Sequence, residues 1–483
     1  MNTALLATGH EYASRSVQGG ARSTSRKRQI GWNFAEWFVL GQTFFPALLY
    51  IPGSQPFRVL IRLFAYAIPL AALAYYSFIA RHKKGRVSRP HPATPWLILA
   101  LTVLGVMLLH PTTNTFLAGL AQIGLYLAVM SPVFWAPAFV KSPERLRRLL
   151  WLLLICNGIN SLVGVMQVRD PGTWMPREFS SNITQTQYGL DAVGYAGAGG
   201  RTIIRPPGLG DAPGQVAGPA VFALFLGLVF ALTNKVWWKK LLSFLLAWAG
   251  GAAIFLSFVR ASFLIAIGMT VVYFLVQLQS RRIARAATFA LVVAAVITVA
   301  FISAAATGGQ SLVDRFQTLL ADNPVNLYNE NRGNQVANAF SELLPQYPFG
   351  AGLGRWGMML SYFGNSTSAV SPPIWVEIQW PAFIVDGGIL LLLLYPVGVV
   401  IALSQEARLS FGRGDRQVKQ LAALIFSASC GIFALCFSYP VFLAPIGMQF
   451  WFLAGGLHGV KCVSRRPATK RTAVKPPSAT SAV

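Results

Sequence analysis

Long apolar stretches separated by short polar ones follow one another along most of this chain. A helix that crosses a bilayer needs about 20 mostly apolar residues, and the sequence offers about twelve such segments. They lie near 33–51, 57–80, 95–110, 114–134, 147–168, 214–233, 241–257, 261–279, 286–305, 378–403, 420–438 and 440–459. The pattern predicts an all-α, polytopic membrane protein of about twelve transmembrane helices, whose membrane domain spans 32–459.

The composition agrees with this class. The chain has 483 residues, of which 54% are hydrophobic and 11% charged, whereas soluble domains carry about 25% charged residues. Residues 1–31 are polar and lack the apolar core of a signal peptide, so we expect them to remain as a cytoplasmic tail. Residues 460–483 are rich in Lys, Arg, Pro, Ser and Thr, which predicts a second cytoplasmic tail without fixed structure.

Basic residues set the predicted orientation. The cluster Arg26-Lys27-Arg28 favours a cytoplasmic N-terminus, and alternating the spans from there places all eleven lysines inside. The basic residues left outside are ten arginines: Arg58, Arg62, Arg169, Arg177, Arg201, Arg205, Arg260, Arg315, Arg332 and Arg355. The formal net charge of +25 is therefore mostly topogenic, and because it is split among short loops we expect no nucleic-acid partner.

Two predicted outward segments, about 169–213 and 306–377, are too long to be simple turns. Connections longer than about 12–15 residues are usually functional or disordered. In the second segment, 314–320 and 334–344 have helical apolar spacing. We therefore expect a large loop on the outer, periplasmic side that carries short packing helices.

Several kinds of chemistry are disfavoured outside the membrane. Cys156, Cys430 and Cys436 lie in predicted spans and Cys462 lies inside, so no thiol nucleophile is expected there. Only His110 is placed to face outward, which disfavours His-rich zinc sites and a Ser-His-Asp triad. The chain also lacks a phosphate-binding GxxxxGK[ST] motif. We expect neither a metal nor a cofactor.

Three outward arginines occupy unusual positions. Arg260 lies between two apolar spans with almost no loop, which marks either a functional site or an arginine that caps a hairpin. Arg205 begins a stiff, Pro- and Gly-rich entry to a span, and Arg332 opens a predicted helix, where a cation opposes the helix dipole. A guanidinium binds two phosphate oxygens at once, so the arrangement favours an anion such as a diphosphate.

Three motifs in order resemble one family. They are Arg205-x-x-Gly208 followed by Pro213-Gly214, the Ser257–Ser262 hairpin around Arg260, and Arg332 followed by Pro348-Phe349-Gly350-Ala351-Gly352-Leu353-Gly354. Over about residues 200–400 the chain resembles the O-antigen ligase and polymerase superfamily of bacterial envelope proteins.

The resemblance implies a metal-independent glycosyltransferase at the periplasmic face of the bacterial inner membrane. Its donor and acceptor would be polyprenyl-diphosphate-linked oligosaccharides, surrounded by membrane lipids, with a flippase and a chain-length regulator of the same pathway as further partners. Arg205, Arg260 and Arg332 would bind the diphosphate and stabilise it as leaving group. Arg201 and Asp386 join them as candidate substrate-binding residues, and Arg260, Arg332 and Glu377 are the candidate catalytic residues.

This chain departs from the family at one point. Ligases of the superfamily have a His-Asn pair at the start of the span after the large loop, where this chain has Glu377. A carboxylate there would act as a base or hold the acceptor sugar; equally, it would be an interfacial group paired with an outer arginine. Loss of the His-Asn pair favours a polymerase of O-antigen or exopolysaccharide units over a ligase that transfers glycan to lipid A-core or protein.

Asp386 supports a competing interpretation. It lies about 12 Å into the tenth predicted span at 1.5 Å per residue, so we expect it to pair with Arg260 or another arginine, or to carry protons. Twelve spans with an intramembrane acid also fit a secondary transporter or a flippase of lipid-linked glycans. The absence of duplicated halves disfavours that alternative.

Overall fold

The computed structural model describes residues 31–80, 89–175, 194–196, 202–279, 283–321, 326 and 328–464. The chain divides into Met1–Gly31 and Trp32–Val483, and every element below belongs to the second unit. Arg201, one of the candidate substrate-binding residues, lies outside the described residues.

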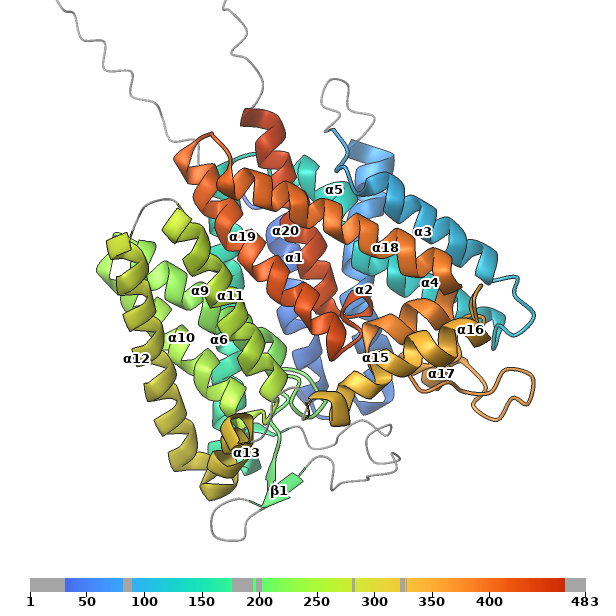
Figure 1. Cartoon of the computed structure of the whole chain (residues 1–483), viewed down its shortest axis with the longest axis horizontal. Coiled ribbons are helices and arrows are strands. Elements are labelled where there is room, and N and C mark those ends of the chain that lie inside the picture. The colour runs from blue at the N-terminus through green and yellow to red at the C-terminus, as the bar shows by residue number, and fades with distance from the viewer. Residues whose placement is uncertain are drawn as a thin grey trace, which may run out of the picture. The chain divides into compact units, whose positions relative to one another are not determined.

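Helices dominate the described part of the chain (Figure 1). The principal ones are α1 (Phe34–Phe44), α2 (Arg58–Tyr75), α3 (Thr94–Met107), α4 (Phe116–Met130), α5 (Pro132–Phe139), α6 (Pro143–Arg169), α9 (Ala217–Thr233), α10 (Trp237–Leu256), α11 (Arg260–Gln279), α12 (Ile283–Gly308), α18 (Gln379–Phe411), α19 (Arg416–Ala434) and α20 (Pro445–Ser464). Shorter helices are α7 (Pro171–Trp174), α13 (Gln310–Ala321), α15 (Asn334–Asn338), α16 (Leu344–Gln346) and α17 (Gly357–Phe363).

The predicted membrane class is confirmed, while the count of twelve spans stays a prediction. Within the described residues, 8 helical segments are long and apolar enough to cross a bilayer: Arg58–Phe78, Phe116–Phe139, Pro143–Arg169, Trp237–Leu256, Arg260–Gln279, Ala286–Gly308, Gln379–Phe411 and Arg416–Phe437. Helices α3 and α9 are apolar but shorter. The predicted span 33–51 is only partly α-helical, because α1 ends at Phe44 and a 3₁₀ turn (Pro46–Tyr50) follows.

One element was not predicted. In the segment 169–213, β1 (Gly194–Ala196) and β2 (Thr202–Ile204) pair as antiparallel strands, with Gly194 opposite Ile204. The all-α prediction therefore holds for the apolar segments but misses this small sheet, whose strands are too short to give a two-residue periodicity. The short helices expected at 314–320 and 334–344 are confirmed by α13 and by the helical turns from Asn329 to Gln346.

Two apolar clusters hold the described helices together. The larger one contains fully buried aromatic side chains such as Trp135, Trp451 and Tyr126. The smaller one joins the turn between α10 and α11 to α12 and α13, and contains Phe255, Leu256, Phe258, Ala300, Ala304, Leu312 and Phe316. The smaller cluster therefore packs α13 against the turn that precedes Arg260.

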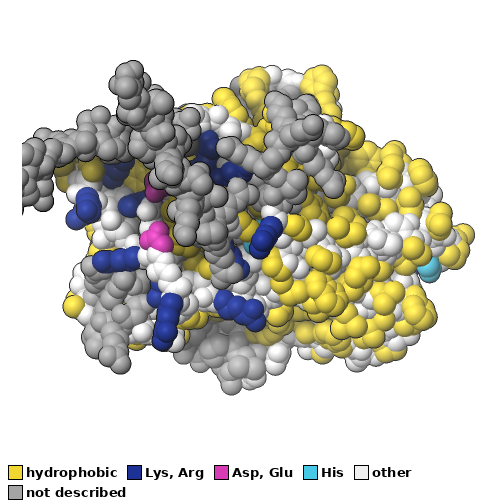
Figure 2. Space-filling model, turned by 90° about the horizontal axis from the view of Figure 1, so that it is seen from above, with side chains coloured by type: hydrophobic (Ala, Val, Ile, Leu, Met, Phe, Trp, Pro, Cys, Tyr) yellow, Lys and Arg dark blue, Asp and Glu magenta, His cyan; other side chains and the backbone are white. Residues whose placement is uncertain are grey.

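Charge divides the two ends of the helical bundle. Helices α6, α10 and α19 begin, and α18 and α20 end, at what we call the lysine end (Figure 1). Every described lysine lies there: Lys141, Lys235, Lys239, Lys240, Lys419 and Lys461. Figure 2 looks onto this end, where Lys and Arg side chains gather beside a broad hydrophobic surface. We call the opposite end the arginine end; which side of a membrane each end faces stays a prediction.

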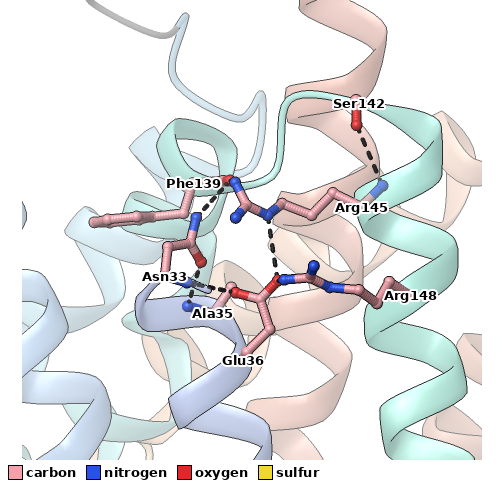
Figure 3. A network of polar contacts seen from close by, with 7 residues as sticks. All are labelled: Asn33, Ala35, Glu36, Phe139, Ser142, Arg145 and Arg148. Carbon is pink, nitrogen blue, oxygen red and sulfur yellow. Dashed lines mark hydrogen bonds and ion pairs between the residues drawn. The ribbon is translucent and has the colours of Figure 1, made fainter. Parts of the chain in front are cut away.

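A polar network anchors α1 to α6 at the lysine end (Figure 3). Asn33 caps α1 by accepting a 2.9 Å hydrogen bond from the Ala35 amide, while the Asn33 amide donates to Glu36 at 2.8 Å. Glu36 is buried and forms ion pairs with Arg145, at 3.3 Å, and with Arg148. Glu36 thus pairs with arginines on one face of α6, and Arg147 lies on another face of that helix.

A break in α18 receives the glycine-rich segment 348–354. The Ile389 amide donates to the Pro348 carbonyl at 2.9 Å, and the Ala351 amide donates to the Val385 carbonyl at 2.7 Å. Gly388 has φ +60°, and a Cβ atom on it would lie 2.2 Å from the Pro348 oxygen. Only glycine fits at such a position. The backbone of the glycine-rich segment therefore lies in direct contact with the backbone of α18 at this break.

Candidate functional site at the arginine end

Hydrogen bonds from two other segments fix the entry to α9. The side chain of Gln167, near the end of α6, donates to the Gly208 carbonyl at 2.7 Å and accepts from the Gly208 amide at 2.9 Å. Tyr50 donates to the Gly210 carbonyl at 3.0 Å, and Asn160 accepts from the Leu209 amide at 2.9 Å. The Pro- and Gly-rich segment therefore has a defined path, which the sequence alone did not indicate.

Two arginines at this end of the bundle stabilise the same segment. Asp211 is 3% exposed and forms ion pairs with Arg58, at 3.2 Å, and with Arg62, at 2.5 Å. A buried carboxylate needs such compensation because an unpaired charge there is costly. Arg58 and Arg62 thus tie α2 to the segment 205–214, and we assign them a structural role.

Arg205 is directed onto the turn between α10 and α11. Its Nε donates a 2.9 Å hydrogen bond to the carbonyl of Ser257, and a Cβ atom added to Gly214 would lie 2.9 Å from its Nη2. Gly214 has φ +69°, so it combines a left-handed conformation with close packing against the guanidinium. The first two motifs of the sequence, which lie far apart along the chain, therefore meet in the structure.

The turn that receives Arg205 is strained. Ser257 is buried, and its Oγ donates to the Ile254 carbonyl at 2.7 Å and accepts from the Val259 amide at 3.2 Å. Phe258 has φ +60°, a region that costs a bulky residue free energy and often occurs at functional sites. Arg260 then begins α11, so its charge lies at the positive end of a helix dipole.

Arg315 of α13, which the motifs did not single out, lies near Arg260. In α13, Phe316 packs edge-to-face on Phe255 and Phe263, with ring centroids 5.0 and 5.9 Å apart. This packing brings the neighbouring Arg315 close enough to Arg260 for the two charges to interact. Partial burial lowers the pKa of Arg315, and the charge of Arg260 lowers it further. An anion bound here would relieve that repulsion.

Arg332 lies in a different group. It forms an ion pair with Glu377, which precedes the first residue of α18, and Gln335 donates to the same carboxylate oxygen at 2.7 Å. The Tyr328 hydroxyl donates to the Phe437 carbonyl at 3.1 Å, which ties this helical segment to the end of α19. Both side chains of the ion pair are partly exposed. Gln335 follows Arg332 by one helical turn, a spacing that would have identified it from the sequence.

Asp386 has other partners than the expected arginine. It is fully buried and accepts three hydrogen bonds of 2.9 Å each, from Gln122 Nε2, Tyr126 Oη and Trp356 Nε1. These neutral donors come from α4 and from the segment that precedes α17. The carboxylate therefore joins α4, α18 and the large loop, and its geometry is that of a structural group.

Arg355 is also engaged within the protein. Its guanidinium donates to the Pro372 carbonyl from Nε, at 3.0 Å, and from Nη2, at 2.8 Å. Its Nη1 donates to the Ala351 carbonyl at 2.9 Å. The side chain is buried and closes the loop that leads to Glu377. We therefore count Arg355 with the structural arginines.

The predicted site residues thus fall into separate groups. The structure brings Arg205 and Arg260 to one turn, pairs Arg332 with Glu377, and surrounds Asp386 with neutral donors. Within the described residues there is no group of three His, Cys, Asp or Glu side chains suited to a metal ion. Comparison with models of known protein families and with curated proteins finds no match to this chain.

Proposed function

We propose that this chain is a membrane glycosyltransferase that polymerises polyprenyl-diphosphate-linked oligosaccharide units at the periplasmic face of a bacterial inner membrane. The observation that carries the proposal is the meeting of Arg205 with the turn that bears Arg260. Arg205 contacts the strained turn, Arg260 begins the helix that follows this turn, and Arg315 of α13 lies close enough for its charge to interact with that of Arg260. A doubly charged diphosphate suits such a site because each guanidinium can bind two of its oxygens.

In the proposed reaction, a hydroxyl of the acceptor glycan attacks the anomeric carbon of the donor sugar. A new C–O bond forms as the bond between that carbon and the diphosphate breaks, and the lipid diphosphate leaves with the electron pair. Arg205 and Arg260 stabilise the charge that develops on the leaving oxygens. The proton of the attacking hydroxyl passes to the carboxylate of Glu377, which Gln335 and Arg332 orient.

The pairing of Arg332 changes its proposed role. The resemblance to the ligase and polymerase superfamily implies that Arg332 binds diphosphate, but here it contacts Glu377. We propose that Arg332 positions the carboxylate that faces the acceptor. Trp375, two residues before Glu377 in the chain, is 72% exposed and offers an aromatic face in the same segment. Such a face suits a sugar ring as well as the membrane interface.

The test is elongation by the purified full-length protein. It would be mixed with a synthetic polyprenyl-diphosphate oligosaccharide in the absence of nucleotide and metal, and the products separated by size. Longer glycans are expected. A ligase would transfer the glycan only to a different acceptor, and a flippase would move it between leaflets of a vesicle without elongation. If the wild-type protein forms no longer glycan, the polymerase proposal is wrong.

A further inference from the structure

A lysine at the opposite, lysine end lies between two tryptophan rings. The Lys239 ammonium, in the first turn of α10, is 5.2 Å from the ring centroid of Trp238 and 5.9 Å from that of Trp151 on α6. Trp151 is held in place by Phe230 of α9, which it meets edge-to-face at 5.4 Å. The packing of three helices therefore fixes where this positive charge lies, which is unusual for a long and flexible lysine side chain.

A second cation faces the same place. Arg147 precedes Trp151 by one turn of α6, so the two side chains lie on one face of that helix. Its Nη2 donates to Asn234 Oδ1 at 3.1 Å, in the turn between α9 and α10. Asn234 is 8% exposed, and its Nδ2 has no hydrogen-bond partner among the described residues. A buried donor left unpaired is costly, which points to a missing acceptor.

The positive charge of Arg147 and Lys239 is not balanced by the buried acid Glu36. Glu36 is engaged with Arg145 and Arg148 on another face of α6 (Figure 3). The first turn of α10 contains no acidic residue, and its N-cap makes no side-chain hydrogen bond. The partial positive charge of the helix start therefore adds to that of the two cations. Glu144, one turn before Arg147, is the exposed acid of this region.

An exposed apolar stripe continues from these cations along α10. Trp238, Leu241 and Leu245 follow one another at spacings of three and four residues, so they share one face of the helix. They are 48%, 51% and 51% exposed. A soluble anion would make no contact with this apolar stripe, whereas the acyl chains of a lipid would cover it. Headgroup and chain contacts would thus be arranged in line along one helix.

We propose that Arg147, Lys239, Trp151 and Trp238 form a binding site for the headgroup of an anionic phospholipid, with the acyl chains along Leu241 and Leu245. The headgroup phosphate lies between Arg147 and Lys239 and accepts from them, and the indole rings lie at the level of the headgroups. The inference does not depend on the proposed glycosyltransferase activity, because the site lies at the other end of the bundle.

The experiment compares lipid affinities of the purified full-length protein in detergent. Binding of phosphatidylglycerol and of phosphatidylcholine would be measured by native mass spectrometry for wild type, for an Arg147→Gln/Lys239→Gln variant and for an Arg413→Gln/Lys419→Gln control. The control removes equal charge from the start of α19 at the same end. Since one cation near a membrane surface changes anionic lipid binding about fivefold, we expect the first variant to lose more than about tenfold in phosphatidylglycerol affinity. The control should change it less than about twofold.

Further measurements keep the result decisive. A Lys239→Arg variant retains the charge and the stacking, so it should bind phosphatidylglycerol like wild type even if the double variant unfolds. Equal losses in the double variant and the control would overturn the proposal by showing a general charge effect. Displacement of the lipid by millimolar inorganic phosphate would also overturn it, since the site would then prefer a soluble anion. Glycan elongation is measured separately, so failure of either proposal leaves the other intact.

Discussion

Arg332 forms an ion pair with Glu377, which lies two residues before the start of α18. The cation predicted to bind diphosphate is therefore bound to the carboxylate predicted as a base. The pair separates the candidate site into an acceptor part, around Glu377, and a donor part, around Arg205 and Arg260. Each part can be tested by itself.

Replacement of Glu377 tests the acceptor part. Glu377→Gln keeps the size of the side chain and one acceptor oxygen but removes the base, so elongation should slow by about 10²–10⁴-fold. The rate would be measured with saturating lipid-linked oligosaccharide. Glu342→Gln, at an exposed acid of the same loop, is the matched control and should leave the rate unchanged. Equal rates in both variants would show that Glu377 is not the base and acts only as an ion-pair partner at the interface.

Lysine substitutions test the donor part while they preserve charge. Arg205→Lys and Arg260→Lys each remove a forked guanidinium, and each should lower kcat/KM for the lipid-diphosphate donor by about 10–100-fold. Arg169→Lys provides the control, because Arg169 is exposed at the end of α6. Wild-type kcat/KM in the Arg260→Lys protein would contradict the diphosphate role of that residue.

Gly388 should be irreplaceable for folding. A Cβ atom there would clash with the Pro348 carbonyl and would occupy a left-handed conformation. Gly388→Ala should therefore cost at least about 2 kcal/mol of stability. Thermal unfolding in detergent measures the change. Gly268→Ala in α11 is the control, because nothing lies within 4 Å of its added methyl group, and it should unfold at the wild-type temperature or above.

The buried Asp386 should respond to loss of one donor. Trp356→Phe leaves one carboxylate oxygen without its indole partner, at a cost of about 1–3 kcal/mol in thermal unfolding. Trp375→Phe, at an exposed tryptophan, should leave stability unchanged. If Asp386 is structural, the KM of the Trp356→Phe protein for the donor stays at the wild-type value. A raised KM with unchanged stability would instead indicate that Asp386 takes part in substrate binding.

The stability of the protein should fall in mild acid because of His91, which precedes α3. Burial, with smaller contributions from the charges of His458 and Lys461, lowers the pKa of His91 to about 3. Above about pH 6.5 the ring is neutral in both states. Below that pH the unfolded chain takes up a proton that the folded protein excludes, so stability decreases until about pH 3.

The size of this effect can be measured by substitution. Between about pH 6.5 and 4.5, wild type should lose about 2 kcal/mol more stability than His91→Asn. Asparagine can still accept the hydrogen bond that the Ala93 amide donates to His91 Nδ1 at 3.1 Å. If the stability of the two proteins has the same pH dependence, His91 is not the cause of the loss of stability in acid.

The sequence predicted the spans well and the site only in part. Apolar length and periodicity depend on local composition, so α6, α10, α11, α18 and α19 appear close to their predicted places. The three motifs also indicated Arg205, Arg260 and Arg332 as residues to test, and the departure from the family's His-Asn pair indicated Glu377. The partners of Asp386 were not predictable, because Gln122 and Tyr126 lie on a distant helix and carry no local signal that they face it.

What the sequence determined by itself is the membrane class and the segregation of the described lysines to one end, since both follow from hydrophobicity and charge along the chain. Only the tertiary structure decided which charges meet. Helix packing paired Arg332 with Glu377, brought Arg205 to the turn before Arg260, and fixed Lys239 between two tryptophans. These outcomes depend on contacts between residues far apart in the chain, where the rotation and offset of packed helices choose the partner.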